Sequence, residues 1–167
     1  ALKPVDEFDS KTIDGLKPNA NLNNDLLRKR ADLLEAQAEQ LRRLANLVHE
    51  RSVQDALMAE FKKDDSKVNL LRAALLVGKL DNADINPKHY EKVVNEMATE
   101  IAEKLPKDAD ASKRLTALGK YMFEENGYHG SRGDYYNRAN SYLNEVIDDR
   151  EGIPITLSVL YMELARR

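Results

Sequence analysis

Residues 27–48 read LRKRADLLEAQAEQLRRLANLV, and this stretch decides the fold class of the N-terminal part of the chain. Large apolar residues recur at every seventh position, and an alanine stands four residues after each of the first three. Such spacing predicts an α-helix with one apolar seam, which either packs in an intramolecular helical hairpin or pairs with a second chain as a dimerising coiled coil. About three heptads are present, so both arrangements stay open. The seam consists of Leu27, Ala31, Leu34, Ala38, Leu41, Ala45 and Val48.

The segments on either side of this seam differ in character. Residues 1–20 hold two prolines and a glycine without helical periodicity, which predicts a flexible arm or a strap laid over the domain. The seam helix is expected to begin at an asparagine cap near Asn23. A shorter helix, capped by Ser52, is expected to follow and to end in a polar connector. We therefore predict an N-terminal helical arm at residues 21–65.

Residues 66–123 predict further helices, because apolar residues repeat at helical spacing between recognisable breakers. One helix is expected to stop near Gly78. Pro87 is suited to the first turn of the next helix, because proline there removes only a donor that has no helical partner. Another helix is expected to open at Ser112.

Residues 124–140 contain three glycines among tyrosine, histidine, arginine and aspartate side chains. Aromatic residues are poor linker residues, so this segment is predicted to be a structured loop. A short helix follows, with Gly152 as its expected C-cap. Pro154 then predicts the first turn of a last helix, which has an apolar face.

Composition narrows the class of protein. The chain is 42% hydrophobic and 33% charged, with 7 glycines and 5 prolines in 167 residues, so a packed helical core under a charged surface is expected. A net charge of −3 with mixed signs does not resemble a nucleic-acid binder. No apolar run approaches the ~20 residues of a membrane-spanning helix. The chain has no cysteine, which excludes disulfides, thiolate metal sites and a cysteine nucleophile within it.

Four separated blocks mark the C-terminal third: YMFEENGY at 121–128, DYY at 134–136, NSYLN at 140–144 and GIPITLS at 152–158. In this order they resemble the SirB-type transglutaminase-like family of bacteria, whose domain also occurs beside an F-box in some eukaryotic proteins. The strong resemblance covers residues 115–167. The helices that precede it, from about Val68, resemble the N-terminal helical region of the family.

This resemblance implies the first part of a papain-like, transglutaminase-type core. Active members of that superfamily carry a cysteine near the start of a buried helix, with a histidine and an acidic residue on later strands. Here the matching helix start, residues 152–156, has no cysteine, and the later histidine would lie beyond Arg167. The chain is therefore expected to be a truncated core that is not an enzyme by itself, and any β-sheet of the core is expected downstream.

The sequence offers one catalytic candidate, Thr156. Its side chain is a hydroxyl at the matching helix start. It serves as a substitute nucleophile, as an oxyanion-pocket donor at the helix N-terminus, or as a group that caps or packs against the helix. An alcohol needs an aligned base, and the sequence shows none, which favours the last of these roles. Neither a cofactor nor a metal site is expected, since His129 has no second histidine at ligand spacing.

The structured loop and the residues after it supply the binding candidates. Tyrosine has an apolar face and a hydroxyl, which suits an interface, and the same residues can instead buttress the loop against the last helix. An acidic run at residues 145–151 either binds a cation or basic partner or is the solvated end of a helix. The binding-surface candidates are His129, Asp134, Tyr135, Tyr136, Asn140, Tyr142 and Asn144.

The sequence thus predicts a mostly α multi-helix array, with an N-terminal hairpin or coiled-coil-like arm leading into the first helices of a truncated transglutaminase-like core at residues 66–167. The favoured function is a non-catalytic scaffold that acts as a protein-interaction or regulatory module. Two alternatives stay open: part of an acyl-transfer or peptide-hydrolysing enzyme completed beyond the chain end, and a self-associating structural module that forms a homodimer through the helix at 27–48. A soluble cytoplasmic protein is favoured over an exported mature form, and the partner is expected to be a protein.

Overall fold

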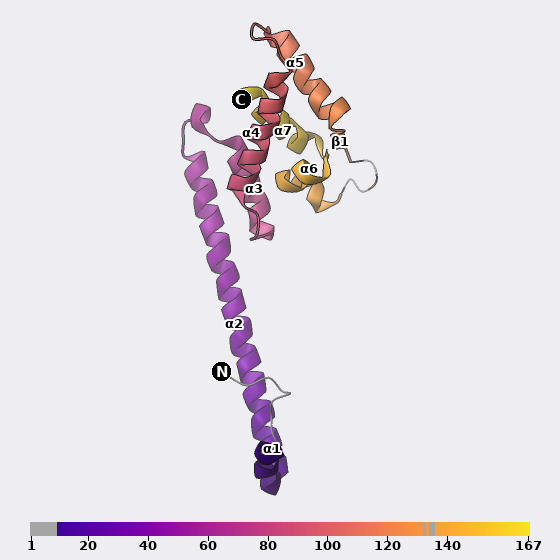
Figure 1. Ribbon diagram of the computed structural model, residues 1–167. Helices are drawn as coiled ribbons and strands as arrows, with labels where there is room; N and C mark the ends of the chain where they lie inside the picture. Colours follow the sequence, from indigo (N-terminus) through magenta and orange to yellow (C-terminus); the bar gives the residue numbers. More distant parts are fainter. Residues whose placement is uncertain (1–9, 132, 134–135) are drawn as a thin grey trace. The chain divides into compact units, whose positions relative to one another are not determined.

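The computed structural model describes residues 10–131, 133 and 136–167, and it confirms the predicted mostly α fold (Figure 1). The chain divides into two units, Ala1–Val48 and His49–Arg167, which we call the N-terminal and C-terminal units. Helix α2 (Ala20–Phe61) contributes residues to both. None of the helices in the described ranges has an apolar stretch of the length that a bilayer requires.

The N-terminal unit is helical over its described residues. Part of the arm predicted at residues 1–20 lies outside the described residues, and the remainder forms α1 (Ser10–Leu16) and the 3₁₀ turn η2 (Lys17–Asn19). The Asn23 side chain donates a hydrogen bond to the Leu16 carbonyl at 2.7 Å, so the expected helix cap instead contacts the preceding helix.

Helix α2 runs without interruption for 42 residues. A hairpin within residues 21–65 is therefore not formed, and the expected break before Ser52 is wrong. No glycine or proline occurs between Ala20 and Phe61, and a serine in a helix interior costs only about 0.5 kcal/mol relative to alanine. Continuing the helix through Ser52 is therefore inexpensive.

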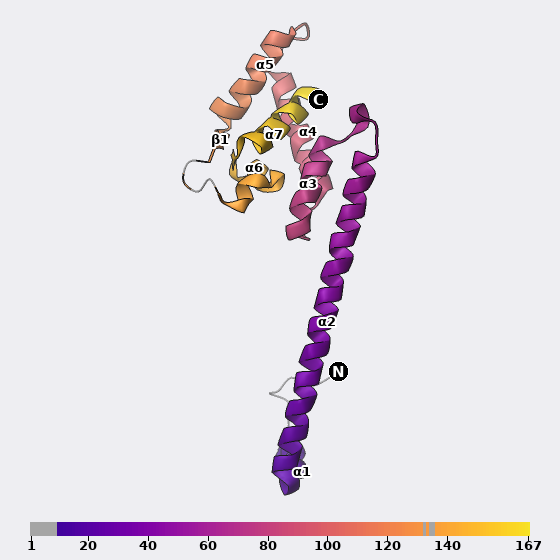
Figure 2. The ribbon, with the colours of Figure 1, turned by 180° about the vertical axis from the view of Figure 1, so that it is seen from behind.

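The C-terminal unit packs its helices around α7 (Pro154–Arg166), which contacts α3 (Leu70–Asp81), α4 (Pro87–Glu103), α5 (Ala111–Gly119) and α6 (Leu143–Asp149) (Figures 1 and 2). The core holds fully buried leucine, valine and methionine side chains from most of these helices. The shorter elements of this unit are η3 (Asp65–Lys67), the π-helical turn η4 (Lys120–Glu125), β1 (His129–Gly130), η5 (Arg138–Ser141) and β2 (Glu151–Gly152).

Helix ends in this unit follow local chemistry. Asn69, Asn86 and Asp110 each accept a backbone N–H hydrogen bond as N-cap of α3, α4 and α5. Pro87 and Pro154 occupy the first turns of α4 and α7, which confirms both predictions. The predicted domain boundary at residues 65 and 66 falls in the connection between α2 and α3, and it stays a prediction.

Two of the expected helix ends are wrong. Gly78 lies inside α3, which continues to Asp81. Helix α6 ends at Asp149, and its C-cap is Arg150, whose φ of 61° lies in the left-handed region, and not Gly152. The Arg150 guanidinium donates to the Asn126 carbonyl at 3.1 Å, so an additional contact accompanies the left-handed conformation of a residue with a Cβ atom.

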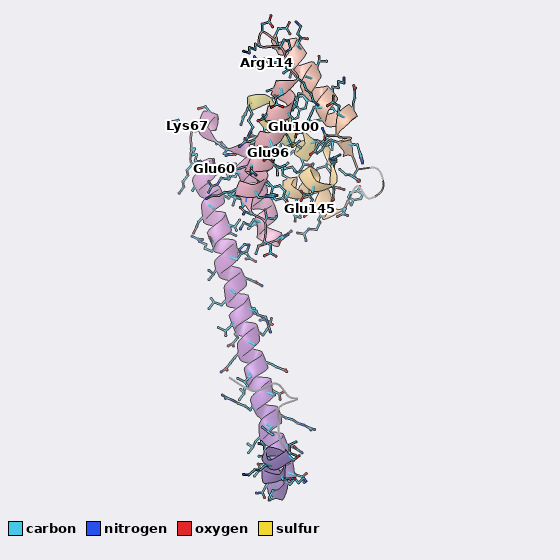
Figure 3. All side chains as sticks on the ribbon, viewed as in Figure 1. Glu60, Lys67, Glu96, Glu100, Arg114 and Glu145 are labelled. Carbon is cyan, nitrogen blue, oxygen red and sulfur yellow. The ribbon has the colours of Figure 1, made fainter. Side chains whose placement is uncertain are left out.

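Glu60 ties the last turn of α2 to the start of α3 within the C-terminal unit (Figure 3). Its Oε1 accepts from Lys63 Nζ at 2.6 Å and from the backbone N–H of Asn69 at 2.7 Å. The hydrogen bond from Lys63, followed by that from Asn69, holds the pKa of this carboxyl below its ordinary value of 4.5. The charged carboxylate therefore stabilises the folded state.

We expect Glu60→Gln to lower the free energy of unfolding at pH 7 by on the order of 1 kcal/mol, because the amide oxygen is a weaker acceptor. A carboxyl with a lowered folded-state pKa contributes stability above its unfolded pKa and loses it as pH falls through the folded value. The difference between Glu60→Gln and wild type should thus shrink below about pH 4.5. Urea unfolding from pH 7 to pH 3 measures this, with Glu50→Gln as the exposed control on the same helix. A difference that grows toward pH 3 would contradict the assignment.

Candidate functional site

The candidate site forms where the segment after η4 meets the start of α7. Strands β1 and β2 pair in parallel, with His129 opposite Glu151 and Gly130 opposite Gly152. The His129 N–H donates to the Arg150 carbonyl at 2.9 Å, and the Ser131 N–H donates to the Gly152 carbonyl at 3.2 Å. This two-residue ladder joins the loop to the entry of α7, although no sheet was expected within the chain.

Gly152 is required by close packing. A Cβ atom at this position would lie 2.7 Å from Val146 Cγ2 and 2.9 Å from Thr156 Oγ1. Both distances are shorter than any ordinary carbon contact, so only glycine brings β2 this close to α6 and α7. Gly130, the opposite residue in the ladder, has open space beside it, since a Cβ atom there would have no neighbour within 4 Å.

Thr156 lies in the first turn of α7, at the helix start that matches the nucleophile position in the resemblance. Its side chain is buried, at 7% exposure. The hydroxyl Oγ1 is 2.9 Å from the Asn140 carbonyl and 2.9 Å from the Ile153 carbonyl. The Asn140 carbonyl also accepts from the Ile153 N–H at 3.2 Å. The hydroxyl is thus directed at backbone acceptors, and it binds η5 to the start of α7.

Tyr142 takes part in a polar cluster that joins η5 to the end of α3. Its hydroxyl donates to Asp81 Oδ2, and Arg138 Nη2 contacts the same carboxylate. Arg138 Nη2 also donates to the Tyr142 hydroxyl at 3.0 Å. The hydrogen bond to Asp81 raises the pKa of Tyr142 above its ordinary value, because it stabilises the neutral phenol beside a carboxylate. Sequence reasoning missed Asp81, since it precedes Tyr142 by 61 residues and no local pattern links them.

Asn140 and Asn144 are both buried. The Asn144 amide Nδ2 donates to Glu145 Oε1 at 2.7 Å, whereas Asn144 Oδ1 is a buried acceptor without a partner among the described residues. Asn144 Oδ1 faces α3, where a Cβ atom on Gly78 would lie 2.7 Å away. Asn144 therefore packs α6 against α3, whereas the Asn140 carbonyl joins η5 to the start of α7.

His129 and Tyr136 are the exposed members of the predicted binding surface. Tyr136 is 92% exposed, and His129 Nδ1 lies 3.0 Å from the Gly130 carbonyl. Asp134 and Tyr135 lie outside the described residues. The structure thus places Asn140 and Asn144 in the interior, places Tyr142 in the cluster with Asp81, and leaves His129 and Tyr136 facing solvent. A binding role for this set stays a prediction.

An acidic pocket of about 380 Å³ lies beside the loop. Three members of the acidic run line it, and the fourth, Asp148, instead accepts a hydrogen bond from the Tyr90 hydroxyl at 2.6 Å. Within the described ranges, no three His, Cys, Asp or Glu side chains come together in an arrangement that could hold a metal ion. The pocket is lined by Gly133, Asn137, Ala139, Asn140, Glu145, Asp149 and Glu151 (Glu145 is marked in Figure 3).

Parts of this chain are similar to known proteins. Residues 88–167 match the family model of the transglutaminase-like superfamily. A UPF0162 protein of Xylella fastidiosa is 32% identical over 104 residues, which are 62% of this chain and 37% of the relative. A UPF0162 protein of Vibrio cholerae is 24% identical over 105 residues, which are 63% of this chain and 39% of the relative.

The human F-box only protein 21 is 39% identical over 56 residues, which are 34% of this chain and 9% of that protein. The chain spans less than two fifths of the length of each of these three relatives. No solved structure gives a significant match. The β1–β2 ladder, the buried start of α7 and the helices α5 and α6 that pack on α7 thus lie within residues 88–167, the region that matches the transglutaminase-like superfamily, in a chain without cysteine.

Proposed function

We propose that the chain carries a SirB-type transglutaminase-like scaffold that serves protein interaction or regulation rather than acyl transfer. The observation that carries this proposal is the state of the Thr156 hydroxyl. It is buried and contacts the carbonyls of Asn140 and Ile153. A hydroxyl becomes a nucleophile only when a base accepts its proton, and a backbone carbonyl is not such a base.

Thr156 is therefore assigned a structural role at the start of α7. One hydroxyl proton can be donated to one carbonyl at a time, so Thr156 joins η5 to the first turn of α7 when it donates to Asn140 and stabilises that turn itself when it donates to Ile153. An acyl group would also have to reach the Thr156 hydroxyl oxygen, which is buried and lies 2.9 Å from the position that a Cβ atom on Gly152 would occupy. Attack geometry requires open space beside the nucleophile, and this oxygen is enclosed.

The surface beside this buried start supports the interaction role. Tyr136 and His129 present an aromatic ring and an imidazole to solvent, and the acidic pocket lies on the same loop. Aromatic side chains are enriched in protein interfaces, whereas acidic groups there select a basic counterpart. A protein segment with a lysine or arginine side chain matches this chemistry.

Substitution of Thr156 separates the two roles. We expect Thr156→Val, which keeps the shape and removes the hydroxyl, to lower the free energy of unfolding by about 1 kcal/mol, because one buried hydrogen bond to a backbone carbonyl is lost. Thr156→Ser keeps the hydroxyl and should be closer to wild type. Acyl-transfer and peptide-hydrolysis activity should be absent from wild type, Thr156→Val and Thr156→Ser alike, because the proposed scaffold has no nucleophile.

The assay is run on the chain and on the full-length product of its gene. Turnover that Thr156→Val abolishes and Thr156→Ser retains, with the fold intact by circular dichroism, would make Thr156 a nucleophile and overturn the proposal. Turnover that neither substitution changes would favour the competing hypothesis, in which the chain is part of an enzyme whose catalytic residues lie outside it.

A further inference from the structure

The N-terminal unit carries an apolar helix face that follows a strict heptad pattern. We call it the α2 seam, and it lies wholly within Ala1–Val48. Alternating steps of four and three residues place its members on one side of a helix, as positions a and d of a coiled coil. The large residues occupy d and the alanines occupy a. The α2 seam consists of Leu27, Ala31, Leu34, Ala38, Leu41, Ala45 and Val48.

The large side chains of the α2 seam are exposed. Leu27, Leu34, Leu41 and Val48 have exposed fractions of 57%, 39%, 66% and 62%. A continuous row of exposed leucines along one helix face is unfavourable in water and marks an interaction surface. Since α2 is one uninterrupted helix, no second helix within residues 21–65 is available to cover the row.

Charge complementarity identifies the occupant. In a parallel, in-register pair, position g of one helix contacts position e of the other helix five residues further along. This rule brings Arg30 of each copy opposite Glu35 of the other, so symmetry forms the attractive pair twice. The neighbouring pairs join Asn23 or Gln37 to an arginine, so no like charges meet. A second copy of this chain is therefore complementary to the seam in both shape and charge.

The heptad position before the seam supports the same orientation. Asn24 falls at position a, one heptad before Ala31. A single polar asparagine at a pairs with its own counterpart in a parallel dimer and fixes the register. In the antiparallel alternative that pairs each leucine with an alanine, the positive stretch at residues 28–30 would instead lie opposite the positive pair Arg42 and Arg43.

The length of the seam is sufficient for a stable contact. Residues 27–48 span roughly 32 Å of helix at 1.5 Å per residue. Two copies together bury eight large side chains and six alanines. With the aliphatic parts of the side chains at positions e and g, the buried area is on the order of 1,000 Å², which is at the lower limit for a specific interface. We propose that two copies of this chain associate through the α2 seam as a parallel, in-register, two-stranded coiled coil. This proposal is independent of the role of Thr156.

Cysteine cross-linking tests the orientation, because the chain contains no cysteine of its own. We expect Ala31→Cys and Ala45→Cys each to form a disulfide-linked dimer under mild oxidation, since an a position meets itself in a parallel pair. Ala36→Cys is the matched control, because position f lies on the opposite side of the same helix and Ala36 is exposed. Cross-linking of Ala36→Cys as efficient as that of Ala31→Cys would overturn the parallel arrangement. So would a mixture of Ala31→Cys and Leu41→Cys that cross-links faster than Ala31→Cys alone, because these two positions meet in the antiparallel alternative.

Light scattering over a concentration series tests the association. Ala38→Glu should raise the dimer dissociation constant by about 100-fold or more, because two glutamates would meet in the seam, whereas Ala36→Glu should change it less than about threefold. Arg30→Glu should weaken the dimer, and the double exchange Arg30→Glu with Glu35→Arg should restore it. A wild-type chain that stays monomeric at every concentration would overturn the proposal. All seven tyrosines lie between Tyr90 and Tyr161, so their near-ultraviolet circular dichroism verifies independently that the C-terminal unit is folded.

Discussion

Leu160→Ala is expected to lower the free energy of unfolding of the C-terminal unit by about 3–5 kcal/mol, the range for a fully buried leucine whose removal leaves a cavity. Leu160 lies on α7 and has 0% exposure. Helix α7 contacts four other helices, and these cannot all move inward to fill the space of one isobutyl group. The loss therefore includes both the transfer free energy and the cavity term.

Urea unfolding followed by tyrosine fluorescence measures this loss, because every tyrosine lies in the C-terminal unit. Ile155→Ala is the control on the same helix. Ile155 is 66% exposed, so its truncation should cost less than about 0.5 kcal/mol. Similar losses for the two variants would show that α7 is not the central helix of this unit.

Gly152→Ala is expected to destabilise the same unit by about 2–3 kcal/mol, the upper part of the range for overpacking. The added methyl would lie 2.7 Å from Val146 Cγ2 and 2.9 Å from Thr156 Oγ1. Val146 is fully buried and has no room to retreat. Either β2 moves away from α6, or Thr156 loses its hydrogen bond to the Asn140 carbonyl.

Gly130→Ala is the matched control for this prediction, because Gly130 pairs with Gly152 and has open space around it. It should change the free energy of unfolding by less than about 0.5 kcal/mol. In the double variant Val146→Ala with Gly152→Ala, the missing methyl groups make room for the new one. The sum of the losses for the two single variants should then exceed the loss measured for the double variant by on the order of 1 kcal/mol. If the losses of the two single variants simply added, the methyl group added at Gly152 would not be clashing with Val146.

Helix content and several boundaries were predictable from the sequence, because they depend on interactions between near neighbours. Pro87 and Pro154 have a fixed φ and lack the N–H, so they mark first turns wherever they occur in such a context. The heptad spacing of Leu27 and Leu34 likewise predicts a helix without reference to the remainder of the chain. The same local reasoning failed at Ser52 and Gly78, because a single weak helix former does not stop a helix that packing or its neighbours continue.

The candidate site was predictable as a segment but not as an arrangement. Glycines and tyrosines indicated a structured loop, and the C-terminal motifs indicated a transglutaminase-like region, which the match over residues 88–167 supports. The residue types alone did not indicate which of the binding-surface candidates have side chains that face the interior. Asn140, Asn144 and the exposed Tyr136 lie within nine residues of one another, yet their exposures differ from nearly complete to nearly none.

The sequence by itself determined the helical class, the seam at residues 27–48 and the absence of a cysteine nucleophile, because each depends on residue identity and local spacing alone. Only the tertiary structure decided that Asp81 binds Tyr142, that Gly152 leaves no room for a Cβ atom, and that the Thr156 hydroxyl contacts backbone carbonyls. These contacts join residues from different elements, and their geometry depends on how α3, α6 and α7 pack, which no short stretch of sequence specifies.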